Sequence, residues 1–294
     1  MKILLTGAFG YLGSIIRSNL SNELIISLSR FNADINADLS KLVPKLPSVD
    51  LVIHAAGRAH LVPSSPHERQ EFFEVNVKGT INLLKGLEQS ILPKSFVFIS
   101  SVSVYGCESG QLVNEDEPLL AKDPYGASKI EAERIITEWC KRNNVICGIL
   151  RVPLIVGINP PGNLKTMIDG IRKGYYFNIA GGKARKSMVL ATDIAKIIPK
   201  LAKVGGVYNI TDGYHPSFLE LSSLIASKLN KRAPLNLPLI FAKMIAKLGD
   251  IFGSKIPLNS RKLTKITSTL TFDDSKARAI LEWSPQNVLQ QFDL

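Results

Sequence analysis

The sequence predicts an α/β protein, a doubly wound parallel sheet followed by a smaller, mainly helical C-terminal domain. Up to about residue 155, short apolar runs alternate with longer segments of helical period, which is the pattern of a parallel sheet wrapped by helices. After Arg151 the alternation is broken by Pro153 and the run Pro160–Gly162, and from Pro216 the periodicity is mainly helical.

The strands of the first half are expected where short apolar runs are bounded by polar or turn-forming residues. These runs are Lys2–Thr6, Leu24–Leu28, Leu51–His54, Phe96–Ser100 and Val145–Leu150. Apolar spacing predicts helices at Tyr11–Leu20, Glu68–Ser90 and Ser128–Asn143. Later in the chain we expect a helix at Lys165–Lys173, a strand at Ser187–Leu190, a helix from Asp193 and a strand at Val207–Ile210.

Composition narrows the classes of function. The net charge is +11, but Lys and Arg are spread along the chain without interleaved aromatic residues, so we expect no nucleic-acid partner. The three cysteines are far apart and lack ligand spacing, which indicates a reducing, cytoplasmic compartment and no metal site. The first apolar run ends at Thr6, too early for a signal peptide, and no apolar stretch reaches the roughly 18 residues of a transmembrane span.

A glycine-rich turn, Thr6–Gly13, follows the first predicted strand and opens the first predicted helix. Glycines at this place let the backbone turn tightly and let a pyrophosphate approach the positive end of the helix. The turn therefore predicts a dinucleotide site in a Rossmann-type sheet, with a purely structural turn as the alternative. The residues expected to line it are Gly7, Phe9, Gly10, Tyr11, Leu12 and Gly13.

The end of the second strand bears on which dinucleotide binds. An acidic residue about 20 positions after the turn binds the ribose of NAD, whereas a nearby Arg accommodates the additional phosphate of NADP. Here the strand leads into Ser29 and Arg30, with no carboxylate before Asp34. We therefore favour NADP(H) over NAD(H), bound by Arg30, with sugar binding by Asp34 as the alternative.

Two features predict the chemistry. Tyr125 and Lys129 lie four residues apart at the start of a predicted helix and so share one face. An ammonium near a phenol favours the phenolate and brings the phenol pKa toward the range useful in proton transfer. Ser101, directly after the expected strand Phe96–Ser100, can hydrogen-bond an oxygen on the reacting carbon.

With these motifs in order, the chain resembles the extended short-chain dehydrogenase/reductases, in the branch of nucleotide-sugar epimerases, dehydratases and 4-keto reductases. The matching segments are the glycine turn, Asp38–Leu39, Val52–Gly57, Val75–Thr80 with Asn76, Ser100–Gly106, Tyr125 with Lys129, and Arg151–Pro153 leading to Gly157.

The resemblance implies a role for each of these positions. Tyr125 would carry the proton, with Ser101 as its hydrogen-bonding partner and Lys129 beside it. Cofactor contacts are implied for Asp38, Leu39, Ala55, Ala56, Gly57, Asn76, Ser100, Tyr125, Lys129 and Pro153. Substrate contacts are implied for Ser101, Ser103, Asn163, Arg185 and Lys186; of these, Asn163 and Lys186 beside Arg185 fall where relatives hold the uracil and diphosphate of a UDP-sugar. The dinucleotide-binding domain would cover residues 1–155 with a segment near 187–212 returning to it, and residues 156–294 would mainly bind substrate.

The resemblance leaves three reactions and one non-catalytic role open. Dehydratase relatives carry Asp-Glu after the catalytic hydroxyl, where this chain has Val102 and Ser103, so dehydration is disfavoured. Arg30 and the stretch His54–His60 favour NADPH-dependent reduction of a UDP-4-keto-6-deoxy-N-acetylhexosamine in surface-polysaccharide biosynthesis. A UDP-glucose or UDP-GlcNAc 4-epimerase is the alternative. A dinucleotide-sensing regulator is disfavoured because Tyr125 and Lys129 are both present.

Two surfaces complete the expectations. Relatives commonly form homodimers through the helices that correspond here to residues 68–90 and 128–143. The segment Pro238–Gly253 carries Ile240, Phe241, Met244, Ile245 and Leu248 on one face. We expect this face to pack against the C-terminal domain, with peripheral membrane docking as the alternative.

Overall fold

The computed structural model describes residues 1–59, 63, 65–252 and 258–293. The strands are β1 Lys2–Thr6, β2 Leu24–Ser29, β3 Ile35–Asn36, β4 Leu51–His54, β5 Ser95–Ser101, β6 Gly110–Val113, β7 Ile146–Val152, β8 Leu154–Val156, β9 Asn178–Ile179, β10 Met188–Leu190, β11 Gly206–Asn209, β12 Asn236–Leu237 and β13 Leu270–Phe272. The helices are α1 Tyr11–Asn19, α2 Pro66–Phe73, α3 Gly79–Glu88, α4 Pro124–Arg142, α5 Gly162–Lys173, α6 Ala191–Val204, α7 Phe218–Lys228, α8 Leu239–Phe252, α9 Ser260–Thr267, α10 Ser275–Leu281 and α11 Val288–Gln291.

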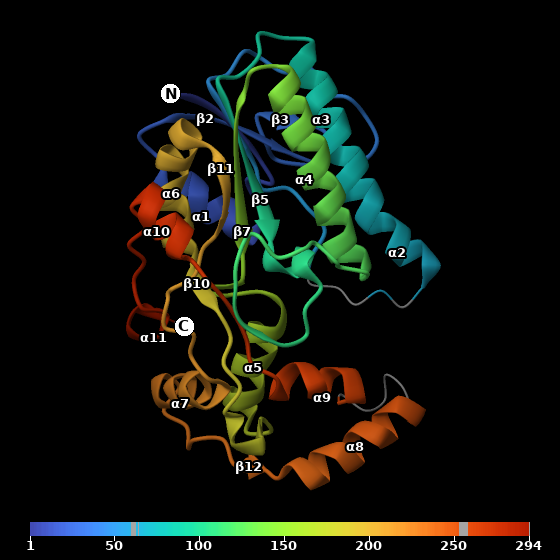
Figure 1. The fold of residues 1–294 in the computed structure, drawn as a ribbon, viewed down its shortest axis with the longest axis vertical. Helices are drawn as coiled ribbons and strands as arrows, with labels where there is room; N and C mark the ends of the chain where they lie inside the picture. Colours follow the sequence, from blue (N-terminus) through green and yellow to red (C-terminus); the bar gives the residue numbers. More distant parts are fainter. Residues whose placement is uncertain (60–62, 64, 253–257, 294) are drawn as a thin grey trace.

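A seven-stranded sheet forms the first part of the molecule, in the order β11-β7-β5-β4-β1-β2-β3, with every pair parallel. Helices cover both of its faces: α1 and α6 lie on one side, and α3 and α4 on the other (Figure 1). Alternate residues of β1 enter different cores, since Ile3 and Leu5 pack with the α1/α6 layer and Leu4 with the α3/α4 layer. The predicted fold class is confirmed.

The segment after β10 returns to this sheet, since α6 packs beside α1 and β11 pairs with β7. The other end of the long axis holds α5, α7, α8 and α9 (Figure 1). There, short parallel pairs join segments far apart in sequence: β8 with β10, β9 with β12, and β6 with β13.

Two predicted helices differ from the structure. The helix expected at Glu68–Ser90 is α2 and α3 joined by a π-helical turn at Glu74–Lys78. The helix expected from Ser128 begins at Pro124, because the Asp123 side chain accepts a hydrogen bond from the Gly126 N–H at 3.1 Å and proline suits the first helical position.

The expected packing of the Pro238–Gly253 segment is wrong. Gly253 lies outside the described residues, and over α8 the five apolar side chains named above are exposed to different degrees, Ile240 and Met244 most of all. The residues of α8 that face the protein are instead the small ones, Ala242, Ala246 and Gly249. Both sides of α8 carry apolar residues, and the side with the small residues is the one that packs against the protein.

Candidate active site

The candidate site lies at the C-terminal edge of the sheet. Strands β1 and β4 are neighbours, although β2 and β3 lie between them in the chain. The connections after β1 and β4 therefore leave in opposite directions and open a crevice for ligands at that edge. Because the strands are parallel, the predicted segments after β1, β4, β5 and β7 all meet there; Ser101, for example, pairs in register with Val152, next to Pro153.

The glycine turn is backbone packed against backbone. Gly7 has φ +68°, and a Cβ on it would lie 2.8 Å from the backbone of Ala56. A Cβ on Gly13 would lie 2.0 Å from the Gly7 carbonyl oxygen. Phe9 points outward, exposed beneath the guanidinium of Arg17. Any side chain larger than that of glycine at positions 7 and 13 would therefore clash with the backbone of the turn.

The start of α1 fits a pyrophosphate. Gly10 is its N-cap, no side chain caps it, and its first turn contains no acidic residue, so the N–H groups there and the positive end of the helix are available to an anion. The Tyr11 hydroxyl is buried without a hydrogen-bond partner among the described residues, and burial raises its pKa to about 12. A Cβ on Gly157 would lie 2.8 Å from this hydroxyl. The cradle and the unpartnered hydroxyl together fit a bound dinucleotide.

The residues after β2 separate the two predicted modes of ribose binding. Asp34 accepts hydrogen bonds from the N–H and the hydroxyl of Ser27, at 2.8 and 2.6 Å, and so is held beside the strand and not at its end. Arg30 is exposed at that end. Burial raises the pKa of Asp38, but hydrogen bonds from Ser40 and the charges of Lys41 and Arg30 outweigh burial and lower it. Arg30 therefore faces the region of Asp38, and the Asp34 carboxylate is already engaged.

A buried chain of hydrogen bonds connects the glycine turn to the π-helical turn. The Ala56 N–H donates to the Thr6 hydroxyl at 3.2 Å, and the two ring nitrogens of His54 contact the hydroxyls of Thr6 at 2.7 Å and Thr80 at 3.0 Å. The Thr80 hydroxyl donates to the Asn76 carbonyl, so it accepts from His54 Nε2, which leaves Nδ1 to accept from Thr6. Burial, with the charge of Lys129, lowers the pKa of His54 to about 3 and keeps it neutral in this role.

Asn76 fixes the backbone after β4. Its Oδ1 accepts from the Arg58 N–H at 2.7 Å, and its Nδ2 donates to the Arg58 carbonyl and to the Ser128 hydroxyl. A Cβ on Gly57 would lie 3.2 Å from Asn76 Oδ1 and 3.4 Å from Lys129 Nζ, and buried Leu39 packs close to this region through Gly79. The predicted segment Ala55–Gly57 thus passes between Asn76 and Lys129.

Tyr125 and Ser101 meet as predicted. Tyr125 lies in the first turn of α4, with its ring edge against buried Phe72 at 6.2 Å between centroids. Burial raises its pKa above the ordinary value, against a hydrogen bond with Ser101 that lowers it. Ser101 Oγ also lies 3.1 Å from Ser103 Oγ, and its single proton can go either to Ser103 or to the Tyr125 oxygen. The three hydroxyls form one cluster, in which Ser101 stabilises the phenolate that burial disfavours.

Lys129 lies one turn further along α4 and is buried. Its Nζ donates to the Ile99 carbonyl at 2.9 Å and lies 4.5 Å from the centre of the Phe98 ring. Burial lowers its pKa to about 8, although the Glu133 carboxylate acts in the opposite direction. The expected lowering of the Tyr125 pKa is not found: burial, together with the charge of Asp123, raises it.

The Ser100 side chain is directed away from the site, and its predicted contact with the cofactor stays a prediction. Its hydroxyl is buried and donates to Glu133, which also forms an ion pair with Arg151 at 2.8 Å. Arg151 Nη1 donates in turn to the Tyr105 hydroxyl at 3.1 Å. Since Ser100 and Ser101 alternate across the strand, only Ser101 points into the site, and any contact of Ser100 with a cofactor would have to come from its backbone.

Sequence reasoning missed Ser128 and Glu133. Ser128 accepts from Asn76 and donates to the Tyr125 carbonyl at 2.8 Å, and Glu133 is buried one turn beyond Lys129. A usable signal was present, because these residues continue the face of α4 that carries Tyr125 and Lys129.

The predicted substrate residues separate into two groups. Asn163 is exposed in the first turn of α5, and Lys186 is half-buried, with burial and the neighbouring charge of Lys265 lowering its pKa to about 8. Arg185, by contrast, donates to the His215 carbonyl at 3.0 Å and lies 3.5 Å from Glu220. Two lysines that are close enough to repel each other favour the binding of an anion between them. Lys265 is not among the substrate residues predicted from the sequence.

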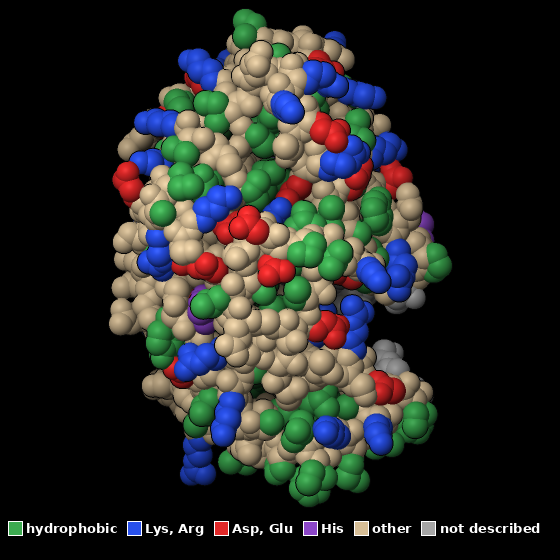
Figure 2. Space-filling view, in the orientation of Figure 1, with side chains coloured by type: hydrophobic (Ala, Val, Ile, Leu, Met, Phe, Trp, Pro, Cys, Tyr) green, Lys and Arg blue, Asp and Glu red, His purple; other side chains and the backbone are tan. Residues whose placement is uncertain are grey.

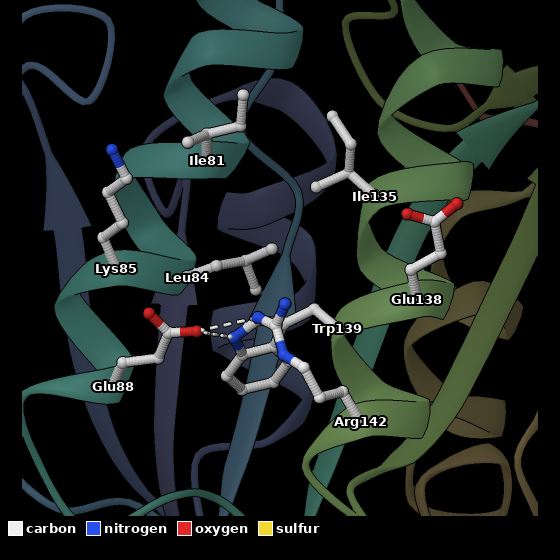
Figure 3. Close-up of a pocket in the computed structure, with 8 residues that line it drawn as sticks. All are labelled: Ile81, Leu84, Lys85, Glu88, Ile135, Glu138, Trp139 and Arg142. Carbon is white, nitrogen blue, oxygen red and sulfur yellow. Dashed lines mark hydrogen bonds and ion pairs between the residues drawn. The ribbon is translucent and has the colours of Figure 1, made fainter.

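A groove of about 200 Å³ lies away from this site, between α3 and α4 (Figure 3). Trp139 and Arg142 both donate to the Glu88 carboxylate across it, at 2.9 and 3.0 Å. Trp139 is 14 residues along α4 from Tyr125, roughly 21 Å at 1.5 Å per residue. The groove therefore belongs to the outer surface of the two helices.

Comparisons with known proteins agree with the predicted resemblance. The family model described as "NAD dependent epimerase/dehydratase family" matches residues 3–211. A UDP-glucose 4-epimerase of Vibrio cholerae is 29% identical over 99% of this chain and 92% of its own length. An N-acetyl-alpha-D-glucosaminyl-diphospho-ditrans,octacis-undecaprenol 4-epimerase of Escherichia coli O157:H7 is 28% identical over 99% of this chain and 93% of its own length.

The fold has solved counterparts. A crystal structure of UDP-N-acetylglucosamine 4-epimerase from Bacillus cereus is 24% identical, with a TM-score of 0.74 over 98% of this chain and 94% of that one. Together with the family match over most of the chain, this confirms the resemblance that the motifs predicted. The protein is an enzyme that belongs to the NAD dependent epimerase/dehydratase family.

Proposed function

We propose that this enzyme transfers hydride to C4 of a UDP-sugar, reducing the keto group of a UDP-4-keto-6-deoxy-N-acetylhexosamine. The observation that carries the proposal is the juxtaposition of Ser101, Tyr125 and buried Lys129 at the sheet edge that also holds the glycine cradle. A phenol, a hydroxyl and an ammonium in this arrangement suit acid–base work at a carbonyl oxygen.

The chain's own residues would hold and move one proton. Bound NADPH would supply the hydride. Tyr125, kept protonated by burial, would donate its proton to the C4 oxygen while Ser101 hydrogen-bonds the same oxygen. The Lys129 ammonium would stabilise the phenolate that remains, and Asn76 would hold the backbone of Gly57 beside it. A protonated Tyr125 suits reduction, whereas an epimerase begins by removing a proton.

Arg30 supports NADP(H) over NAD(H). Asp34, the alternative ligand for the ribose, is engaged by Ser27, while Arg30 is exposed at the end of β2. A guanidinium there can pair with the 2′-phosphate of NADP. We expect NADPH to bind more tightly than NADH, and Arg30→Ala to remove that difference. A preference for NADH in the wild-type enzyme that survives Arg30→Ala would refute the assignment.

For the substrate, we propose that residues 156–294 supply most contacts. Lys186 and Lys265 would bind the diphosphate, with Asn163 toward the base. Arg185, already paired with Glu220, would orient the neighbouring loop instead of binding phosphate. We also propose a cytoplasmic homodimer through α3 and α4, whose groove and partly exposed Ile81 and Ile135 would be covered by a second copy (Figure 3).

A UDP-sugar 4-epimerase is the second candidate, and the two full-length relatives named as 4-epimerases favour it. The two reactions differ in their use of the dinucleotide. We would incubate the enzyme with UDP-glucose, UDP-GlcNAc and a UDP-4-keto-6-deoxy sugar and follow NADPH absorbance and the sugar products. Stoichiometric NADPH consumption with only the keto sugar supports reduction, whereas sugar interconversion without net oxidation establishes epimerisation and excludes the reductase proposal.

A further inference from the structure

Helix α8 presents its large apolar side chains to the outside. At about 100° per residue, Ala242, Ala246 and Gly249 share one narrow sector, and these are its buried residues. The opposite sector, named here the α8 face, consists of Ile240, Phe241, Met244, Leu248, Ile251 and Phe252. Ile240, Met244 and Ile251 are 73%, 60% and 74% exposed. Exposed apolar patches of this kind mark binding surfaces.

The orientation of α8 is fixed by its small face. A Cβ on Gly249 would lie 2.0 Å from the Leu258 carbonyl oxygen, so only glycine allows this contact. Asp250 accepts hydrogen bonds from the N–H and the hydroxyl of Ser260, at the start of α9. Ala242 and Ala246 pack in one cluster with Leu263 of α9. Rotating the helix to bury the α8 face would break all of these contacts.

The α8 face lies at one extremity of the molecule. In Figure 1, α8 forms the end of the long axis opposite the sheet. Figure 2 shows hydrophobic side chains gathered at that end with Lys and Arg among them. Exposed Leu235 and Phe177 lie in neighbouring segments, since the Leu235 carbonyl accepts from the N–H of Asn178, the residue after Phe177. The surface is therefore free to meet a large, flat partner.

Positive charge surrounds this apolar surface. Lys243 and Lys247 lie on α8 between its buried sector and the α8 face. Lys231 and Arg232 are further exposed cations in the described parts of residues 231–267, whereas Arg261 pairs with Glu108 and Lys265 lies near Lys186. The carboxylate within those described parts is Asp250, which is bonded to Ser260. Long basic side chains around an apolar face suit a partner that is apolar inside and anionic at its surface.

We propose that α8 docks the enzyme on an anionic lipid bilayer, lying in the plane of the interface. The α8 face would enter the boundary between headgroups and acyl chains, and the bordering lysines would reach the phosphates. In an isolated amphipathic helix on a bilayer, the side away from the lipid faces water. In α8 that side packs against the rest of the protein. Within the described residues, no helix is long and apolar enough to cross a membrane, so the contact is peripheral.

A second copy of the chain fits this surface less well. A two-fold interface brings the same patch of both copies together, so Lys243 and Lys247 would lie close to their own equivalents. In the described parts of residues 231–267 the carboxylate is Asp250, which is already bonded to Ser260, so that arrangement is repulsive. Anionic lipid supplies the missing negative charge along with the apolar interior.

Co-sedimentation with large vesicles tests the proposal on the full-length protein without substrate. We compare vesicles of phosphatidylcholine with vesicles that also contain phosphatidylglycerol. The wild-type protein should pellet with the anionic vesicles and be released by salt. The triple variant Ile240→Ser/Met244→Ser/Ile251→Ser should bind at least about tenfold more weakly, because apolar burial supplies much of the affinity. Lys243→Gln/Lys247→Gln should lose the preference for anionic lipid.

Matched controls keep the result interpretable. Leu24→Ser/Ile91→Ser/Ile280→Ser removes three exposed apolar side chains outside α8 and should bind vesicles as the wild type does. Unchanged circular dichroism and unchanged turnover of soluble substrate in the α8 variants would exclude misfolding. Wild-type protein that stays in the supernatant with both vesicles overturns the proposal, as does full binding by the triple α8 variant. A wild-type dimer that the α8 variant converts to monomer overturns it too and assigns the face to a second copy.

Discussion

In α4 the ionisable side chains Lys129 and Glu133 are buried, whereas in α8 the largest apolar side chains are exposed. Both helices have conventional contacts elsewhere: the outer face of α4 carries the exposed Arg134–Glu138 ion pair, and the inner face of α8 packs on α9. Buried charges and exposed apolar faces are both costly, so each persists where it serves a purpose. The comparison fits the two proposals, in which α4 carries catalytic side chains and α8 contacts a lipid bilayer.

The sharpest way to test the α4 side is Tyr125→Phe, which removes one oxygen atom and leaves the ring against Phe72. If Tyr125 carries the proton, kcat should fall about 10²- to 10⁴-fold. Dinucleotide affinity should change little, because the glycine cradle is untouched. Steady-state NADPH oxidation and a separate binding titration measure the two effects. Wild-type turnover in this variant would contradict the catalytic assignment and restore the reading of a dinucleotide-sensing regulator.

The next test removes the charge of Glu133. In Glu133→Gln the Arg151 guanidinium stays buried without a counter-charge, so the free energy of unfolding should fall by about 3–5 kcal/mol. Glu282→Gln, at an exposed ion pair with Lys200 away from α4, should cost less than about 1 kcal/mol. Urea unfolding of both variants gives the values. Equal losses would mean that burial does not distinguish these two ion pairs.

Much of this could be predicted from the sequence, and the α4 face shows why. β1 and β4 lie within the predicted limits, and Ser101 meets Tyr125, because parallel strands bring their C-terminal ends together and strand alternation fixes which side chain points inward. The same alternation directs the Ser100 hydroxyl to Glu133, so the predicted contact of Ser100 with the cofactor would come from its backbone.

The rest depends on contacts between distant segments. Periodicity predicts the apolar residues of α8 but not which side of the helix packs against the protein. That choice depends on the contacts of Gly249 with Leu258 and of Asp250 with Ser260, at the start of α9. The π-helical turn at Asn76 likewise could not be predicted from the sequence, since it depends on contacts with Arg58 and Ser128. Part of the His54–His60 stretch, including His60, lies outside the described residues, so its use as a sign of substrate class stays a prediction.

The pH dependence of stability sharpens the comparison further. Burial lowers the pKa of Lys129 from 10.5 to about 8, so between these values the unfolded chain holds a proton that the folded chain has released. Unfolding free energy should therefore rise with pH across this window, by up to about 3 kcal/mol. Lys129→Met should flatten the rise, and Lys186→Met should flatten it by a similar amount, because burial lowers the pKa of both lysines from 10.5 to about 8. Urea unfolding at pH 7.5, 9 and 10 tests this, and an unchanged slope in Lys129→Met would contradict it.

The smallest expected effects test α8. Adding apolar bulk to its buried face should destabilise the protein more than removing apolar bulk from its exposed face. Ala246→Leu adds apolar bulk to a fully buried position against Leu263 and should cost about 1–3 kcal/mol. Met244→Ser removes a large apolar side chain from the opposite face and should stay within about 0.5 kcal/mol, because that side chain is already mostly in water. Thermal unfolding of the two variants decides the point. If Met244→Ser proved the more destabilising of the two, the helix would be packed the other way round and its apolar face would be part of the core.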